Sequence, residues 1–346
     1  MFALRGIAIS FSVFVLVYCA VSFAVCVAWR SLVLHFQRYP ARRVADLLFA
    51  LRLLPLVSAV VVTAVFTVPS FLLLEPRAID EPVGAIPLAL GLCGAILGIF
   101  GIANAALAMR RASRAIDGWT REAQPIAATA PIPVLRISPK VSTNNKFATP
   151  NAPSQIALAH TAPAMVAAGI ARPKVLVSSA VESMLSVQEL RSALNHEVAH
   201  VRRRDNLKKL LLCFVAFPGM AALEAAWLEA TEMAADDEAV ANAAEALDLA
   251  SALIKLSRVA PAQPSVDLTA ALLHSPASVL DTRVGRLIAW NERHKRGERN
   301  EDHDGVAQGW SPWCGLAVIL VATAVFTVTY SQLLVHIHTA TEWLVR

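Results

Sequence analysis

Two histidines and one glutamate form the group in this chain whose types and spacing predict chemistry most directly. They occur in the run His196-Glu197-Val198-Ala199-His200. Residues four apart lie on one face of a helix, one turn apart, so both imidazole rings can reach one tetrahedral metal ion. Glu197 falls beside that face, where it can take a proton from a water held at the metal. The spacing predicts a zinc site with a glutamate as general base.

Acidic residues after the motif supply candidates for the rest of the site. In Glu232-Met-Ala-Ala-Asp236 the two acids are four residues apart, on one face of a second predicted helix. We interpret Glu232 as the third metal ligand and Asp236 as a carboxylate that orients a ligand histidine from outside. Asp205, directly after the motif helix, is a second candidate for that outer role. Glu229 competes with Glu232, and Asp237 with Asp236, and the alternative for the whole cluster is a solvated helix face.

The composition predicts a membrane protein. The chain has 346 residues, of which 56% are hydrophobic and 16% charged, whereas soluble domains carry about 25% charged residues. Four uncharged runs are each near or above the roughly 20 residues that cross a bilayer as a helix: Gly6–Ala28, Leu53–Leu74, Val83–Met109 and Pro312–Val335. The first run could be a cleaved signal peptide, but its length and the lack of a small-residue cleavage site favour a retained anchor.

Basic residues predict how the chain is oriented in a cell membrane. The loop between the first two runs holds five arginines against one aspartate, the next loop is net acidic, and three arginines follow the third run. Because cytoplasmic loops carry the excess of basic residues, we expect both termini outside and the metal motif in the cytoplasm. The net charge of +5 fits anionic lipid better than nucleic acid.

We expect five parts along the chain. In order, they are a three-helix transmembrane region (1–110), a proline-rich cytoplasmic tether (111–155), a zinc metallopeptidase domain (156–290), a charged linker (291–311), and a fourth transmembrane helix with a short outer tail (312–346). Six prolines between Gln124 and Gln155 indicate an extended, mobile tether, because such a run cannot hold a helix.

Local patterns within the metallopeptidase domain predict its elements. Ile156–His160 and Lys174–Ser178 resemble short strands, and the second could bind substrate backbone along its edge. Ser186 with Glu189 forms a capping box that starts the helix of the two histidines. We expect one further helix over Ala221–Ala250, which is rich in alanine and glutamate.

The segment 207–228 is apolar enough to suggest another membrane span. A full crossing would put Glu232 on the opposite side of the bilayer from the histidines, and Pro218-Gly219 can reverse the chain instead. We therefore expect a helical hairpin, either packed in the domain core or dipping into the inner leaflet.

A hydrolase also needs a donor that stabilises the developing oxyanion. The three tyrosines lie in or near the predicted spans, so a histidine or an arginine is the candidate. His274 and Arg283 are the pair that we single out. From chemistry alone His274 has the properties of a surface or core histidine.

These residues resemble those of the BlaR/MecR-type membrane metallopeptidases. The likeness is carried by Leu190–Asp205, by Glu232–Val240 and by the upstream run Gly169–Val177, and it is specific over Gly169–Val240. It implies a mainly α, polytopic membrane protein with about four transmembrane helices and a cytoplasmic α+β zinc peptidase domain of gluzincin type. It also implies one Zn²⁺ per chain. Since the sequence ends at Arg346, we expect no penicillin-binding-like sensor and do not transfer antibiotic sensing.

The roles that the resemblance implies match those reached from the residues. His196, His200 and Glu232 would be the zinc ligands, Glu197 the general base and Asp236 the outer carboxylate. The related HtpX and CAAX-prenyl protease group shares both zinc motifs, and its His-Pro…Arg segment resembles the segment from 274 to 283. That likeness implies a transition-state role for His274, although membrane spans separate the zinc motifs in that group.

The sequence thus predicts an integral-membrane zinc metalloendopeptidase whose partners are a protein or peptide substrate and the lipid bilayer. The substrate would be a cytoplasmic or membrane-associated protein, cleaved in regulation or in quality control of the HtpX kind. One alternative is a zinc-binding signalling component that does not cut. A transporter is disfavoured, because the apolar runs contain no charged residue that could line a path.

Overall fold

The computed structural model of the chain describes residues 2–36, 39–75, 84–126, 131–137, 163–214, 217, 219–259, 270–271, 277–295, 330 and 332–341. The fold is mainly α-helical with one small sheet. Three of the described helical segments are long and apolar enough to cross a membrane, namely Phe2–Trp29, Ala41–Leu74 and Ala85–Thr120. They contain the first two predicted spans and all but the first two residues of the third, while most of the fourth predicted span lies outside the described residues.

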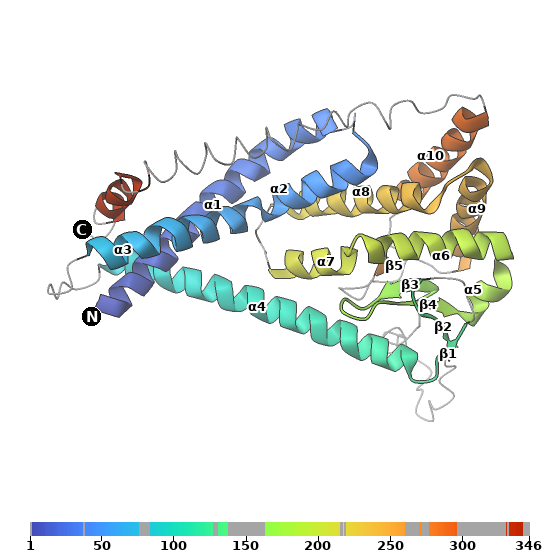
Figure 1. Cartoon of the computed structure of the whole chain (residues 1–346), viewed down its shortest axis with the longest axis horizontal. Coiled ribbons are helices and arrows are strands. Elements are labelled where there is room, and N and C mark those ends of the chain that lie inside the picture. The colour runs from blue at the N-terminus through green and yellow to red at the C-terminus, as the bar shows by residue number, and fades with distance from the viewer. Residues whose placement is uncertain are drawn as a thin grey trace, which may run out of the picture.

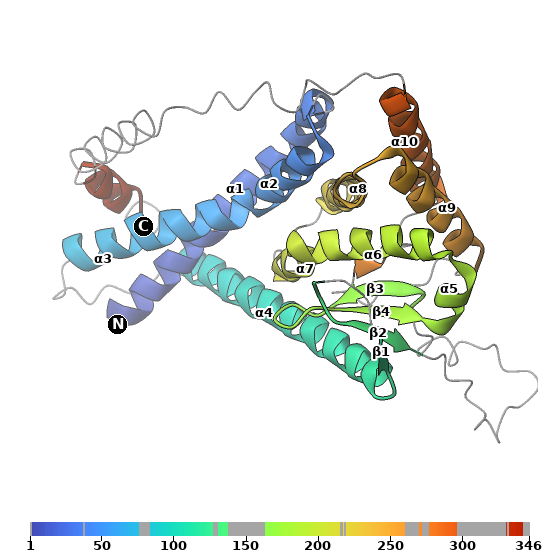
Figure 2. The ribbon, with the colours of Figure 1, turned by 45° about the vertical axis from the view of Figure 1, so that its right-hand side comes forward.

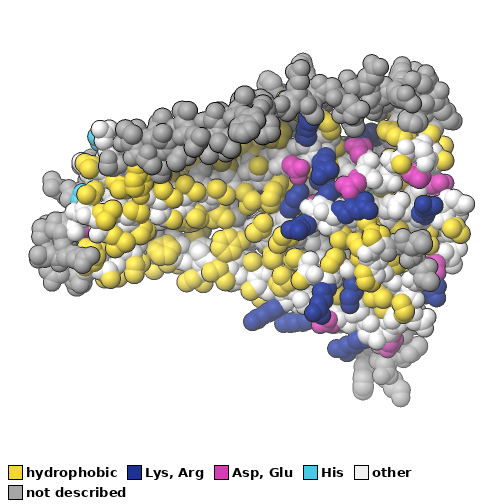
Figure 3. All heavy atoms as spheres, in the orientation of Figure 1, with side chains coloured by type: hydrophobic (Ala, Val, Ile, Leu, Met, Phe, Trp, Pro, Cys, Tyr) yellow, Lys and Arg dark blue, Asp and Glu magenta, His cyan; other side chains and the backbone are white. Residues whose placement is uncertain are grey.

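These segments form a membrane arm built from helix α1 (Phe2–Phe36), helix α2 (Ala41–Val61), the π-helical turn η1 (Val62–Thr67), helix α3 (Val68–Leu74) and helix α4 (Ala85–Thr120). The α1–α2 pair and α4 spread apart along the long axis of the molecule, and the sheet and the helices between residues 179 and 295 lie toward the open end (Figures 1 and 2). The C-terminal helical residues 332–341 lie at the closed end, near α3. On the face shown in Figure 3, hydrophobic side chains cover the visible part of the arm, and charged side chains gather at the open end. The surface therefore changes from lipid-like to water-like along one axis.

Glycines on α4 allow its neighbours to approach closely. A Cβ at Gly91 would lie 3.0 Å from the carbonyl oxygen of Ala8 on α1, and a Cβ at Gly94 would lie 2.9 Å from that of Phe11. Small residues at such contacts are how membrane helices pack without a hydrophobic driving force between them.

The sheet has five strands in the order β1 (Gln124–Pro125), β2 (Val134–Ile137), β4 (Lys174–Ser178), β3 (Met165–Ala168) and β5 (Ala270–Ala271). Strand β4 is parallel to β2 and antiparallel to β3. The predicted strand at 174–178 is therefore confirmed, but the prediction that it binds substrate along its edge is wrong, because β4 is paired on both sides. The predicted strand Ile156–His160 lies outside the described residues.

The segment predicted as a tether contributes to the fold. Helix α4 continues to Thr120, and β1 and β2 lie in the sheet. The prediction of an extended, mobile segment from 124 is therefore wrong at these two strands. The reason is local: prolines flank Val134–Ile137 and do not interrupt it, so all four residues can pair with β4 while Val134 and Ile137 are buried.

Six helices complete the domain: α5 (Ser179–Met184), α6 (Val187–Arg202), α7 (Asp205–Phe214), α8 (Ala221–Ala239), α9 (Ala243–Val259) and α10 (Ala277–Lys295). The capping box of Ser186 and Glu189 is present at the start of α6. One face of the sheet packs against α6, α9 and α10, and the other face packs against the end of α4.

The single helix predicted over Ala221–Ala250 is broken into α8 and α9. Asn242 starts α9 by accepting a hydrogen bond from the backbone N–H of Glu245, at 3.0 Å, and Glu245 accepts one from Ala241, at 2.8 Å. An asparagine side chain that bonds the backbone locally competes with a continuous helix. Helix propensity alone predicted the wrong length for that reason.

Helices α7 and α8 form the two arms of the predicted hairpin, which packs against the membrane arm. Helix α7 contacts α4 and α2, and α8 contacts α2. At the bend, Phe214 and Phe217 pack with Tyr18 of α1 and Ala59 of α2. The tip of the hairpin thus packs against two of the candidate membrane-spanning helices.

Candidate metal and active site

Helix α6 brings the two motif histidines together. His196 and His200 are buried, with 0% and 2% of their surfaces exposed, and their Nε2 atoms lie 3.1 Å apart. Because the capping box fixes where α6 begins, the i, i+4 spacing places both rings on the face that packs against α8.

Helix α8 places Glu232 opposite the two histidines. Its Oε2 lies 3.6 Å from Nε2 of His196, and its Oε1 lies 3.6 Å from Nε2 of His200. Ligands about 2.0–2.1 Å from one tetrahedral ion lie about 3.3 Å from each other, so these separations suit a common metal ion. The three residues form the group of potential metal ligands found among the described residues. Glu229, the competing candidate, is half-buried and does not belong to that group.

Each histidine is held from behind by a carboxylate. Nδ1 of His196 lies 2.9 Å from Asp236, and Nδ1 of His200 lies 2.8 Å from Asp205. A carboxylate beside Nδ1 favours the tautomer that leaves the Nε2 lone pair for a metal ion, and Nε2 of each ring faces the other histidine and Glu232. Asp237, the competitor for the outer role, is exposed and pairs with Arg286 instead.

Arg283 of α10 ties the acidic residues together. Its side chain is 1% exposed. It donates to Asp236 from Nε at 2.8 Å and from Nη2 at 2.7 Å, and its Nη1 lies 3.0 Å from Oε2 of Glu232. The sequence singled out Arg283 as a candidate oxyanion donor, whereas here its guanidinium is engaged with two carboxylates. His274, the other candidate, lies outside the described residues.

Glu197 is buried and only half of its carboxylate is engaged. Oε2 accepts a hydrogen bond of 2.6 Å from the backbone N–H of Ala167 on β3. Oε1 is buried and has no hydrogen-bond partner among the described residues. Burial raises the pKa of Glu197, although the nearby His200 and His196 oppose that rise. A carboxylate with a raised pKa is a better proton acceptor at neutral pH than an ordinary one.

The charges of the site fit a divalent cation. Four buried carboxylates, those of Glu197, Asp205, Glu232 and Asp236, accompany two buried guanidinium groups, those of Arg203 and Arg283. Lys209 also lies near three of these carboxylates, Glu232, Asp205 and Glu197, and burial lowers its pKa. Acidic groups still outnumber basic groups at the site, and a divalent metal ion would offset that excess. The unpartnered Oε1 of Glu197 and the donor set of two imidazoles and a carboxylate also suit a zinc ion with an open coordination position.

The metal-free pKa values reflect the same imbalance. Burial by itself would lower the pKa of His196, but Asp236 and Glu232 outweigh it and raise that pKa to about 9. Burial would raise the pKa values of Glu232 and Asp236, but Arg283 and the histidines hold both low, that of Asp236 at about 2. The acidic residues thus favour positive charge at the histidines, as the excess of carboxylates also does.

Comparison of the sequence with models of protein families gives a match that covers the site. The model of the BlaR1 peptidase M56 family matches residues 86–287, which is more than half of the chain. The chain belongs to the M56 family. A comparison with curated proteins gave no match.

The M56 match includes every side chain described in the site. It begins at the start of α4 and ends in α10, so it contains the motif helix, Glu232 and Arg283. Together with the apolar helices, it supports a membrane metallopeptidase-type function.

Two contributions to the site were not predicted from the sequence. The bidentate pairing of Arg283 with Asp236 joins residues 47 positions apart, and the Ala167 N–H belongs to a strand that was not expected. A signal for that strand exists, since Met165–Ala168 is an apolar run between Pro163 and Gly169. The arginine has no comparable local signal.

Proposed function

We propose that this M56 family member is an integral-membrane zinc metalloendopeptidase that hydrolyses peptide bonds of a cytoplasmic or membrane-associated protein. The observation that carries the proposal is the buried group of His196, His200 and Glu232, together with Glu197, whose Oε1 has no partner among the described residues. A structural metal site has no need of a buried glutamate beside its ligands, so the set favours catalysis.

In this proposal the metal is a single zinc ion held by Nε2 of both histidines and by Glu232. Asp236 and Asp205 would hold the outer nitrogens and keep both rings oriented, and Arg283 would position Glu232 and Asp236. When bound, zinc would lower the pKa of a water in its open position and polarise the carbonyl of the scissile bond.

Glu197 would move the proton. Its Oε2 is fixed by the backbone of Ala167, so Oε1 is the atom free to accept a proton from the attacking water. The raised pKa favours that transfer, and the same carboxyl would then protonate the leaving amine nitrogen. His274 remains the candidate proposed by resemblance for stabilising the oxyanion.

We further propose that the site works at the cytoplasmic surface of the cell membrane, with both termini outside. Arginines flank the ends of the apolar segments nearest the domain, namely Arg42, Arg43, Arg110, Arg111 and Arg114. Because α7 and α8 pack on the arm, the site would lie close to the membrane surface, within reach of a membrane-associated substrate.

The test is cleavage of an unfolded reporter protein by detergent-purified wild type and Glu197→Gln, with bound zinc quantified in both. We expect about one zinc per chain in both proteins and cleavage by wild type alone, with a loss of at least about 10³-fold in the variant. Zinc in both proteins with equal cleavage would contradict the role of Glu197. Zinc in both with no cleavage by either would favour a zinc-binding signalling component.

A further inference from the structure

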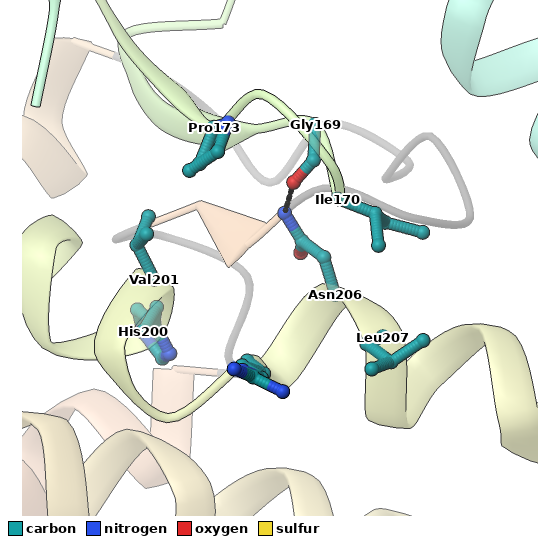
Figure 4. Close-up of a pocket in the computed structure, with 8 residues that line it drawn as sticks. Gly169, Ile170, Pro173, His200, Val201, Asn206 and Leu207 are labelled. Carbon is teal, nitrogen blue, oxygen red and sulfur yellow. Dashed lines mark hydrogen bonds between the residues drawn. The ribbon is translucent and has the colours of Figure 1, made fainter.

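A cleft adjoins the metal ligands on the side of His200. It lies between the turn that joins β3 to β4 and the turn that joins α6 to α7, and its volume is about 250 Å³ (Figure 4). His200 forms part of one wall, so the cleft lies directly beside a candidate metal ligand. The walls are otherwise largely apolar, with Ile170, Pro173, Val201 and Leu207 among their residues.

Asn206 forms part of the wall of this cleft, and its side chain is held in one orientation. Its Nδ2 donates to the carbonyl oxygens of Ala167, at 3.1 Å, and Gly169, at 3.2 Å. Two acceptors on that side fix which end of the amide is nitrogen, since the opposite orientation would set oxygen against oxygen. Oδ1 therefore lies on the other side of the amide. It is buried without a hydrogen-bond partner among the described residues, and Asn206 as a whole is only 7% exposed.

A buried acceptor without a donor is costly and uncommon in native proteins. Figure 4 shows the Asn206 side chain extending from α7 toward Gly169, with its nitrogen on the Gly169 carbonyl. Because Oδ1 is inaccessible from the cleft, Asn206 contributes through its two donated hydrogen bonds, which hold the turn between β3 and β4 against α7.

Arg204 adds a cation to the same cleft at a conformational cost. It follows the end of α6 with φ of 56°, and it is the non-glycine residue with positive φ among those described. Glycine makes this helix-ending turn without strain, whereas arginine makes it at a conformational cost. What the arginine contributes at this position is therefore its side chain. That side chain is exposed and lines the cleft, which has no acidic residue among its lining side chains.

We propose that this cleft is a substrate subsite for an acidic side chain, best filled by glutamate. The carboxylate binds Arg204 and the methylene groups contact the apolar walls, one of which is formed by the turn that Asn206 holds in place. The inference rests on the proposed function, because the bound segment belongs to the polypeptide whose scissile bond lies at the metal.

The test measures binding, so it does not depend on turnover. Zinc-loaded, full-length Glu197→Gln is titrated against three pools of fluorescein-labelled decapeptides, which differ only in one central residue, Glu, Gln or Lys. We expect the Glu pool to bind about tenfold more tightly than the Gln pool, as a charge-assisted hydrogen bond provides. Adding Arg204→Gly should abolish that preference, and adding Arg204→Glu should reverse it in favour of Lys.

Arg202→Gln is the matched control. Arg202 lies two residues earlier, its side chain is 61% exposed, and it is 3.8 Å from Glu238, outside the cleft. Its variant should keep the preference for Glu. Arg204→Gly should also keep or raise the thermal midpoint, because glycine relieves the positive φ.

A preference for Glu that survives Arg204→Gly, or an absence of measurable binding by all three pools, overturns the subsite. Failure of the proposed function has a different signature: zinc-loaded protein with Glu197 intact would then cleave none of the pools. Cleavage that is independent of residue 204 would retain the peptidase and remove only the subsite.

Discussion

The helices around the candidate site bury ionisable side chains, whereas the helices of the membrane arm expose apolar ones. In the first region the buried side chains are ionisable, and Arg283, Asp236 and Asp205 each have a charged or histidine partner within 3.0 Å. In the second region large apolar side chains face outward, such as Phe23 at 69% and Ile99 at 67% exposed. The first region excludes water around charges, whereas the second has a surface suited to lipid.

The comparison also shows where the two regions depend on each other. Helix α7 begins with Asp205, which holds His200, and one turn later Lys208 pairs with Asp46 of α2 at 2.9 Å. Its far end contacts Gly101 of α4. One ten-residue helix thus links a candidate metal ligand to the membrane arm, and separate variants can disturb either end.

The largest effect should come from removing the carboxylate ligand at the site. Glu232→Ala should lose the zinc and reduce peptidase activity to background, because two histidines alone hold zinc weakly. Glu229→Ala, one turn earlier on α8, should keep about one zinc per chain. Metal content and reporter cleavage measure both variants, and a zinc-loaded Glu232→Ala together with a zinc-free Glu229→Ala would reverse the assignment.

Removing the buried guanidinium group of Arg283 should have the next largest effect, on the stability of the protein. Arg283→Met leaves the buried carboxylates of Glu232 and Asp236 without their guanidinium partner, so we expect a loss of about 3–5 kcal/mol without zinc. Zinc should restore part of the stability, since it balances the same carboxylates. Arg286→Met, which breaks an exposed pair with Asp237, should cost less than about 1 kcal/mol. Thermal midpoints with and without chelator test this, and equal effects would contradict the burial argument.

A change in the membrane arm should have a smaller effect and act at a distance. A Cβ at Gly101 would lie 2.5 Å from the backbone oxygen of Phe214, whereas a Cβ at Gly98 meets no atom within 4 Å. Gly101→Leu should therefore displace the tip of α7, cost about 1–3 kcal/mol and weaken zinc affinity. Gly98→Leu should change neither quantity. Equal zinc affinity in both variants would show that the arm does not influence the site.

The smallest effect should arise at the start of α6 and depend on pH. Burial would raise the pKa of Glu189, but Lys255, Ser251 and the backbone of Ser186 lower it to about 2. Because the folded pKa is below the ordinary value, this carboxylate stabilises the protein fully above about pH 4.5, and the contribution is lost as the pH falls toward 2. Glu189→Gln should cost about 1–2 kcal/mol at pH 7.

The same variant should change the shape of the stability profile. The thermal midpoint of wild type should fall more steeply between pH 5 and pH 3 than that of Glu189→Gln, which lacks the titrating group. Lys255→Met breaks the same pair from the other side and should flatten the profile in the same way. Parallel profiles for all three proteins would remove Glu189 from the account.

What the sequence could predict follows the range of the interactions involved. The two histidines and the capping box depend on spacing within one helix, and the first three apolar runs depend on composition over one segment. These features are local, and the structure contains each of them. Glu232 needed a further step, since it lies on a different helix, and geometry now separates it from Glu229.

What the sequence could not predict depends on contacts across the fold. The strand Val134–Ile137 was hidden by flanking prolines, and its pairing partner lies 41 residues further along, where Val134 meets Val175. The break between α8 and α9 depends on one asparagine within a run of strong helix formers. The sequence suggested Arg283 as an oxyanion donor. In the structure it pairs with Glu232 and Asp236, which lie on another helix and could not be identified as its partners from local spacing.

The central claim is that His196, His200 and Glu232 hold one zinc ion. Zinc X-ray absorption spectroscopy of the purified full-length protein tests it directly. The account predicts two imidazole nitrogens at about 2.0–2.1 Å with the remaining ligands oxygen, a spectrum unchanged in Glu197→Gln and lost in Glu232→Ala. Sulfur ligands, or a spectrum unaltered by Glu232→Ala, would contradict it.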